Sequence, residues 1–380
     1  MDRFLSVSAT GDWAAAARTC ADGLASIEPA ESGTQHIGFF YVTDAMAPDT
    51  GSIATLLRQL TPISCWIGAV GSGVVADGRE YHGNPALSVM VGTLPEQSFR
   101  LISGLSGDAG GLAGADLDWA RRVTPAFGII HGNPGYPDVV DAVERLSLDA
   151  GGELGGCFLL GGLAALPVPG AVIAGAEDGG ALAGILFGPG TEVASALSQG
   201  CSPLGGVHRV TEANGDVIMS LDDRPALEVL KEDVGELLAR DLSRLAGYVH
   251  AAFPVTGSDT GDYMVRNLLA IDKDRGWIGI GGTADYGDPL LFVRRDPESA
   301  RTDLIRMVSR LKSRLPDSGI RGGLYFSCVA RGPSLFGGPE TESGIIQREL
   351  GPFPMAGFLG GGEISDARLY AYTGVLVLFC

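Results

Sequence analysis

The sequence is poor in positive charge. It has 27 lysine and arginine residues against 45 aspartate and glutamate residues, which gives a formal net charge of −18. Proteins that bind nucleic acids or anionic membranes present clusters of lysine and arginine to the phosphate groups. No segment of this sequence carries such a cluster. We therefore expect neither nucleic acid nor a membrane as a partner, and we expect the acidity to keep the chain in solution.

Closely spaced cysteines and histidines are also missing. The six cysteines form no Cys-x-x-Cys pair, and the five histidines form no His-x-His or His-x-x-x-His spacing. We therefore expect no transition-metal site and no disulfide framework, and we interpret the cysteines as buried thiols in a reducing compartment. The N-terminus lacks the basic start and apolar run of a signal peptide. These features predict a cytoplasmic protein.

Sequence motifs of several enzyme classes are absent. There is no phosphate-binding P-loop, no Gly-x-Ser-x-Gly nucleophile elbow and no Gly-x-Gly-x-x-Gly run between a strand and a helix. Catalysis through a cysteine would require a general base within reach, and the sequence places no histidine beside a candidate cysteine. The expectation is a protein that is not an enzyme and holds no cofactor.

Glycine is abundant, with 58 of 380 residues, and it marks an internal repeat. Three blocks share one order: apolar strand, helix, second apolar strand, a glycine run that is expected to form a loop, and a closing apolar strand. From the middle of the first strand to the glycine run the separations are 29, 29 and 33 residues (39 to 68, 127 to 156 and 324 to 357). Since a helix joins each pair of apolar strands, we expect parallel β-α-β crossovers.

Between the second and third blocks the pattern changes. Asn214-Gly215 between two apolar runs predicts a β-hairpin, and helices are expected from Pro225 and over 297–315. The whole pattern predicts an α/β protein of repeated β-α-β units that form largely buried mixed sheets, in two halves. The expected division is an N-terminal extension (1–35), an N-terminal domain (36–200) and a C-terminal domain (201–380).

Short motifs in the second half resemble a known family. The clearest are Phe326-Ser327-Cys328-Val329-Ala330-Arg331-Gly332 and Gly357-Phe358-x-x-Gly361-Gly362-Glu363-Ile364, preceded by matches within 200–226 and 265–268. In this order they are similar to the FIST domain family (F-box and intracellular signal transduction), with N-terminal and C-terminal domains over roughly 36–379. The resemblance implies a sensory module that binds small ligands such as amino acids or their derivatives. It would be a stand-alone member, without an F-box or an output domain.

The glycine runs and the family motifs select candidate ligand-binding residues. Ligands of α/β sheets bind beyond the carboxyl ends of the strands, where glycine lets the backbone approach closely. The alternative is that these glycines only form tight turns. Family members often have a histidine where this sequence has Tyr370, so the identity of the ligand does not follow from the resemblance. The residues expected to contact the ligand are Gly71, Ser72, Gly73, Cys328, Arg331, Gly332, Gly361, Gly362, Glu363 and Tyr370.

Two charged residues give this candidate site its chemistry. The guanidinium of Arg331 suits a ligand carboxylate, because it donates two parallel hydrogen bonds, and Glu363 suits a ligand ammonium group. A cation beside Cys328 would also favour a reactive thiolate. The alternative is that Cys328 is an inert core thiol, that Arg331 pairs with Glu340 or Glu342, and that Glu363 caps a following turn.

Taken together, these features predict a small-molecule-binding sensory protein of intracellular signal transduction. Its ligand is expected to be an amino acid or a related small metabolite, and a signalling protein is its expected macromolecular partner. The first alternative is a protein–protein adaptor whose glycine-rich surface docks a partner. The second is a cysteine-dependent enzyme that uses Cys328.

Overall fold

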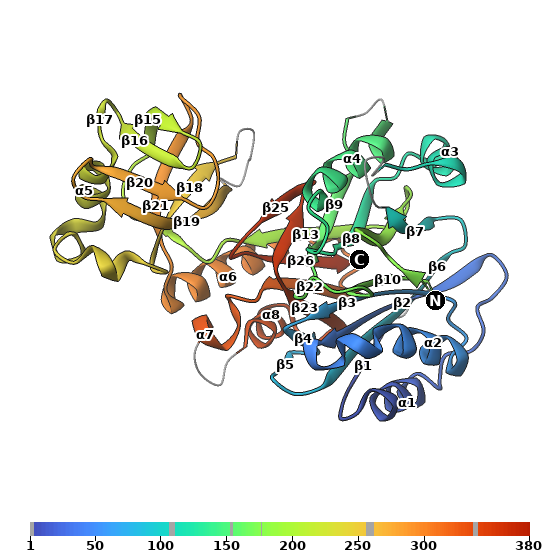
Figure 1. The fold of residues 1–380 in the computed structure, drawn as a ribbon. Helices are drawn as coiled ribbons and strands as arrows, with labels where there is room; N and C mark the ends of the chain where they lie inside the picture. The colour runs from blue at the N-terminus through green and yellow to red at the C-terminus, as the bar shows by residue number, and fades with distance from the viewer. Residues whose placement is uncertain (1–3, 106–110, 153–154, 176, 256–261, 337–340) are drawn as a thin grey trace. The chain divides into compact units, whose positions relative to one another are not determined.

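The chain folds into two compact units in the computed structural model of Figure 1. The structure describes residues 4–105, 111–152, 155–175, 177–255, 262–336 and 341–380. Unit 1 comprises residues 1–198 and 304–380, and unit 2 comprises residues 199–303. The third of the repeated blocks therefore belongs to the same unit as the first two. Unit 2 is the segment that separates the second block from the third.

Unit 1 contains three six-stranded sheets. The first sheet has the order β1 (Leu5–Thr10), β6 (Ala86–Pro95), β2 (Thr34–Thr43), β3 (Cys65–Gly71), β10 (Val172–Ala174) and β11 (Glu177–Asp178). The second has β25 (Arg368–Tyr370), β24 (Gly362–Ser365), β9 (Phe158–Leu163), β8 (Phe127–Gly132), β12 (Leu182–Phe187) and β7 (Phe99–Leu105). The third has β13 (Val193–Ser198), β26 (Gly374–Phe379), β22 (Gly322–Cys328), β23 (Met355–Gly360), β4 (Gly73–Ala76) and β5 (Arg79–His82).

Each of the three sheets is built around one parallel pair of strands. These pairs are β2 with β3, β8 with β9, and β22 with β23, and the other pairings of these strands are antiparallel. Helices lie within the three crossovers: α2 (Thr50–Leu60), α4 (Val139–Gly151), and α7 (Gly332–Phe336) with α8 (Glu342–Leu350). The predicted β-α-β units and mixed sheets are confirmed.

The three blocks exchange hairpins in a closed cycle. The β4–β5 hairpin of the first block pairs with β23 in the third sheet. The β10–β11 hairpin of the second block pairs with β3 in the first sheet, and the β24–β25 hairpin of the third block pairs with β9 in the second. Each sheet is therefore completed by residues of another block, so the three blocks form one unit despite their separation in sequence.

The glycine runs lie largely within strands, which corrects the expectation that they are loops. Gly68 is in the middle of β3, Gly161 is in β9 and Gly357 is in β23. A side chain at these positions would collide with the neighbouring strand, namely with the ring of Phe40, the carbonyl of Ile130 or the carbonyl of Tyr325. Close packing across each parallel pair, rather than turn formation, requires glycine there.

Side chains alternate between two faces along the strands of unit 1. On β2, Phe39 and Tyr41 point into a core that all three sheets share, whereas Phe40 and Val42 point outward. Helices α1 (Trp13–Gly23) and α2 cover this outer face (Figure 1). Helices α3 (Gly114–Val123) and α4 pack in the same way on the second sheet. This two-sided burial explains why the strands read as continuous apolar runs.

Unit 2 is an eight-stranded antiparallel sheet with helix α5 (Ala226–Ala239). Its strands are β14 (Ser202–Pro203), β15 (His208–Asn214), β16 (Val217–Leu221), β17 (Arg224–Pro225), β18 (Val249–Pro254), β19 (Tyr263–Asp272), β20 (Trp277–Ile280) and β21 (Pro289–Arg294), and α6 (Pro297–Lys312) follows β21. The predicted hairpin at Asn214-Gly215 is confirmed. Within the described ranges, no helix of either unit combines the length and the apolar composition that crossing a membrane requires.

Candidate functional site

The three sheets of unit 1 meet where their parallel strands end. Three equivalent backbone hydrogen bonds join them in a ring: Ser72 N–H to Leu359 C=O (2.9 Å), Gly361 N–H to Leu163 C=O (3.0 Å) and Ala165 N–H to Val70 C=O (2.8 Å). The ring brings the predicted site residues of the first block beside those of the third. It therefore places the residues around Gly71 and around Gly361 at one junction, as the prediction requires.

An aromatic cluster underlies this junction. Tyr41, His131 and Phe326 come from β2, β8 and β22, and their ring centroids lie 5.3–6.0 Å apart. Burial lowers the pKa of His131 to about 3, so the ring is neutral at physiological pH. The Tyr41 hydroxyl lies 3.2 Å from His131 Nε2 and can donate to it. The centre of the junction is thus filled by protein side chains.

Arg331 is buried in an ion pair with Glu342 on the outer face of the third sheet. Its Nε lies 2.7 Å and its Nη2 lies 2.6 Å from Glu342 Oε1. Its remaining N–H groups donate to the hydroxyl and carbonyl of Ser198 and to the carbonyl of Tyr372. All five N–H groups of the guanidinium therefore have protein acceptors. The prediction that Arg331 directly holds a ligand carboxylate conflicts with this geometry.

Glu342 is equally well satisfied. The Tyr325 hydroxyl donates to Oε1 (2.9 Å) and the Ser327 hydroxyl donates to Oε2 (2.7 Å), both from β22. Thr341 caps α8 through its side chain, which sets Glu342 in the first turn of the helix. The pairing of Arg331 with Glu342 was one of the two alternatives for this arginine, and the other candidate partner, Glu340, lies outside the described residues.

Glu363 is the carboxyl group of this region that the described residues satisfy only at one of its two oxygens. The Thr373 N–H and hydroxyl both donate to Oε2, at 3.1 and 2.7 Å. Oε1 is buried and has no hydrogen-bond partner in the described part of the chain. Burial raises the pKa of Glu363 to about 8, although Thr373 and the charge of Arg331 lower it in part. Glu363 thus carries a proton at neutral pH unless a cation approaches Oε1.

Cys328 lies at the end of β22, next to this carboxyl group. Burial and the nearby charge of Glu363 raise the pKa of its thiol to about 12, and the charge of Arg331 compensates only in part. The thiolate is therefore negligible at neutral pH. Of the two alternatives for Cys328, this environment favours the inert core thiol over the reactive thiolate, because desolvation outweighs the neighbouring cation.

The other predicted residues surround the same junction. Tyr370 is buried and pairs with Glu363 across β24 and β25. A Cβ at Gly71 would collide with the Gly73 carbonyl and with the Phe358 side chain, a Cβ at Gly362 would lie 3.1 Å from the Tyr370 carbonyl, and Gly332 packs on Leu359. Gly73 begins β4, and the Ser72 hydroxyl bonds the Leu359 carbonyl. The structure thus brings the predicted residues together, mostly as packing and backbone contacts.

Sequence reasoning missed two partners in this region, Ser198 and Thr373. Ser198 ends β13 and lies 133 positions before Arg331 in the sequence, whereas Thr373 precedes β26 and lies 10 positions after Glu363. Ser198 belongs to no recognised motif, and Thr373 closes the segment 369–373, in which only Tyr370 was compared with the family. The pairing of β26 with both β13 and β22 brings the two residues to the end of β22.

Comparison with known families gives two matches. The FIST N domain matches residues 36–224 and the FIST C domain matches residues 226–366. The border between the matches falls within unit 2, before α5. Neither match is an F-box, so the F-box included in the expanded family name is wrong for this chain.

Two mycobacterial proteins are similar over most of their length. The uncharacterized protein Rv0628c of Mycobacterium tuberculosis is 32% identical over 339 residues, which cover 82% of this chain and 83% of the relative. The uncharacterized protein Mb0898c of Mycobacterium bovis is 28% identical over 355 residues, or 86% of each chain. Their names state no activity, so these relatives indicate a shared architecture and no particular ligand.

Proposed function

Because this chain belongs to the FIST family, with both the FIST N and the FIST C domain, we propose that it is a small-molecule-binding sensory protein of intracellular signal transduction. The ligand that we propose carries a protonated amine, as an amino acid or a related metabolite does. A single observation supports this ligand class: the buried Oε1 of Glu363 has no partner among the described residues.

The balance of charge around Glu363 favours a cationic ligand group. The region holds two buried carboxyl groups, Glu342 and Glu363, but its guanidinium is committed to Glu342. A buried carboxylate without a counter-charge is costly, so the group either keeps a proton or acquires a positively charged partner. A ligand ammonium group at Oε1 would displace the proton and supply the missing charge. Arg331 then serves as a positioning residue that holds Glu342 and Tyr372.

Exposed residues adjoin the segment that carries this buried carboxyl group. Its neighbour at two positions upstream, Gly361, is exposed, and Val329, whose N–H bonds Gly360, has 49% of its surface exposed. Tyr372, next to Thr373, adopts a left-handed backbone conformation with φ of 67°. Such a conformation is costly for a non-glycine residue and is common at ligand sites. We propose entry past these residues.

We propose binding without catalysis. Cys328 is the cysteine beside the proposed ligand position, and its thiol is held protonated by burial. The neighbouring carboxyl group is itself protonated at neutral pH and cannot serve as an efficient general base in that state.

A thermal-shift experiment on the full chain tests this proposal. Wild type and Glu363→Gln are each screened with amino acids and with simple amines, and the exposed Glu96→Gln serves as the matched control. A ligand present at about 100 times its Kd stabilises its protein by about 2.7 kcal/mol. We expect an amine-bearing ligand to stabilise wild type and Glu96→Gln but not Glu363→Gln. An undiminished response of Glu363→Gln would refute the site, and recovery of a protein partner without any ligand response would favour the adaptor.

A further inference from the structure

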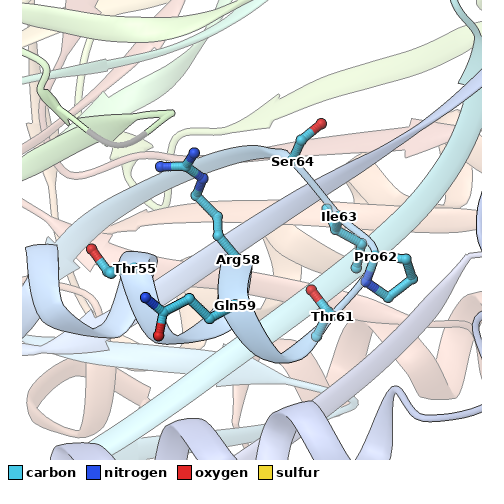
Figure 2. Close-up of a pocket in the computed structure, with 7 residues that line it drawn as sticks. All are labelled: Thr55, Arg58, Gln59, Thr61, Pro62, Ile63 and Ser64. Atoms are coloured by element: carbon cyan, nitrogen blue, oxygen red, sulfur yellow. The ribbon is translucent and has the colours of Figure 1, made fainter.

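A hollow of about 440 Å³ lies at the end of α2, outside the Glu363 region. The last turns of α2 and residues 61–64 line it, as Figure 2 shows. Its volume falls within the range of about 300–1,000 Å³ that is typical of small-molecule sites. The hollow lies beside Cys65, the first residue of β3, whereas the sheet junction lies at Gly71, the last residue of the same strand. At about 3.3 Å per residue, the two places are about 20 Å apart.

The hollow contains an arginine, Arg58. Its side chain is exposed, and its guanidinium forms no hydrogen bond or ion pair with a described residue. Figure 2 shows it extending from the helix toward the segment that carries Ser64. Burial raises the pKa of the adjacent Cys65 thiol, while Ser64 and the charge of Arg58 act in the opposite direction. Among the residues that line the hollow, Arg58 is the only one with a charged side chain.

The helix end limits how much negative charge the hollow accepts. The N–H and hydroxyl of Thr61 both donate to the Leu57 carbonyl, at 3.1 and 2.7 Å. The next residue, Pro62, has no N–H, so it donates nothing to the Arg58 carbonyl. The carbonyls of the last turn carry about half a negative charge, which offsets part of the charge of Arg58. Because the helix end lowers the net positive charge of the hollow, the hollow favours a ligand with one negative charge over a ligand with two.

We propose that this hollow is a second binding site, for a small molecule that presents a single carboxylate group. The Arg58 guanidinium donates two parallel hydrogen bonds to the carboxylate, because two N–H groups of the planar guanidinium match the spacing of the two carboxylate oxygens. The Gln59 amide and the Ser64 hydroxyl are exposed at the rim and supply further donors. The exposed Pro62 provides the apolar surface against which a short carbon chain packs, and the buried Ile63 also lines the hollow.

Nuclear magnetic resonance titration of the full chain tests this site with propionate as the probe. Proton–nitrogen correlation spectra follow the backbone amides of Thr61, Ile63 and Ser64. We expect propionate to shift these signals in the wild type, and we expect Arg58→Gln to weaken its binding about tenfold, the loss expected for a charge-assisted hydrogen bond.

Arg122→Gln is the matched control, because Arg122 is also an exposed arginine in the last turn of a helix, α3. It should bind propionate as the wild type does, and so should Glu363→Gln, since the two sites are separate. The proposal is overturned if propionate shifts none of these signals, or if Arg58→Gln binds it as tightly as the wild type. Equal binding of propylamine, or tighter binding of phosphate than of propionate, would overturn the assignment to a single carboxylate.

Discussion

Substituting Glu363 with glutamine should remove a pH-dependent loss of stability. The folded chain holds the proton of this carboxyl group up to about pH 8, whereas the unfolded chain releases it near the ordinary pKa of 4.5. Between these values the folded state binds the extra proton, so its stability falls as the pH rises. Above about pH 8 both states are ionised and the penalty is constant.

The size of this stability loss follows from the difference between the pKa values of Glu363 in the folded and the unfolded chain. Each pH unit is worth about 1.4 kcal/mol, so the interval from 4.5 to about 8 corresponds to a loss of the order of 5 kcal/mol. For a unit of this size, 1 kcal/mol moves the melting temperature by about 2–4 °C. Glutamine is neutral at every pH and can still accept the two hydrogen bonds from Thr373. The melting temperature of Glu363→Gln relative to wild type should therefore rise by the order of 10 °C between pH 5 and 8.

The assay is thermal unfolding of both proteins across this pH range, without added ligand. Taking the difference between the two curves matters, because other groups titrate as well. His131 contributes with the opposite sign, since its lowered pKa makes the fold gain stability as the pH rises toward 6.5. Glu96→Gln controls for the loss of one surface charge. Parallel curves for wild type and Glu363→Gln would refute the reasoning, because they would mean that the folded carboxyl group is already ionised at neutral pH.

Three further predictions concern the same unit. Arg331→Met should destabilise it by about 3–5 kcal/mol in chemical unfolding, because Glu342 is left buried without its counter-charge; a change under 1 kcal/mol would contradict this role. Gly357→Ala should lower the melting temperature strongly, because its Cβ would collide with the Tyr325 carbonyl, whereas Gly51→Ala, at an exposed position of α2, should be neutral or stabilising by up to about 1 kcal/mol. The thiol of Cys328 should resist alkylation at pH 8 in the native protein and react after unfolding, as mass spectrometry would show; rapid native labelling would contradict its burial.

Local sequence patterns were sufficient to predict the secondary structure of the repeated blocks. Continuous apolar runs such as 37–42 became strands buried on both faces, and Asn214-Gly215 closed a hairpin. These features depend on side-chain periodicity and on turn chemistry, which act between residues near in sequence. The same patterns predicted that Arg331 and Glu363 lie near the ends of strands.

What these side chains contact was decided by pairings between distant segments. The exchange of β4–β5, β10–β11 and β24–β25 among the sheets leaves no local trace, because an apolar hairpin can complete any open sheet edge. The pairing of β26 with β13 and β22 sets Ser198 beside Arg331, 133 positions away in the sequence, and places Thr373 beside Glu363. Arg331 is thereby satisfied and one oxygen of Glu363 is not. Sequence specified which charged groups reach the junction, and the tertiary structure determined which of them remains without a partner, because burial and counter-charge depend on the whole fold.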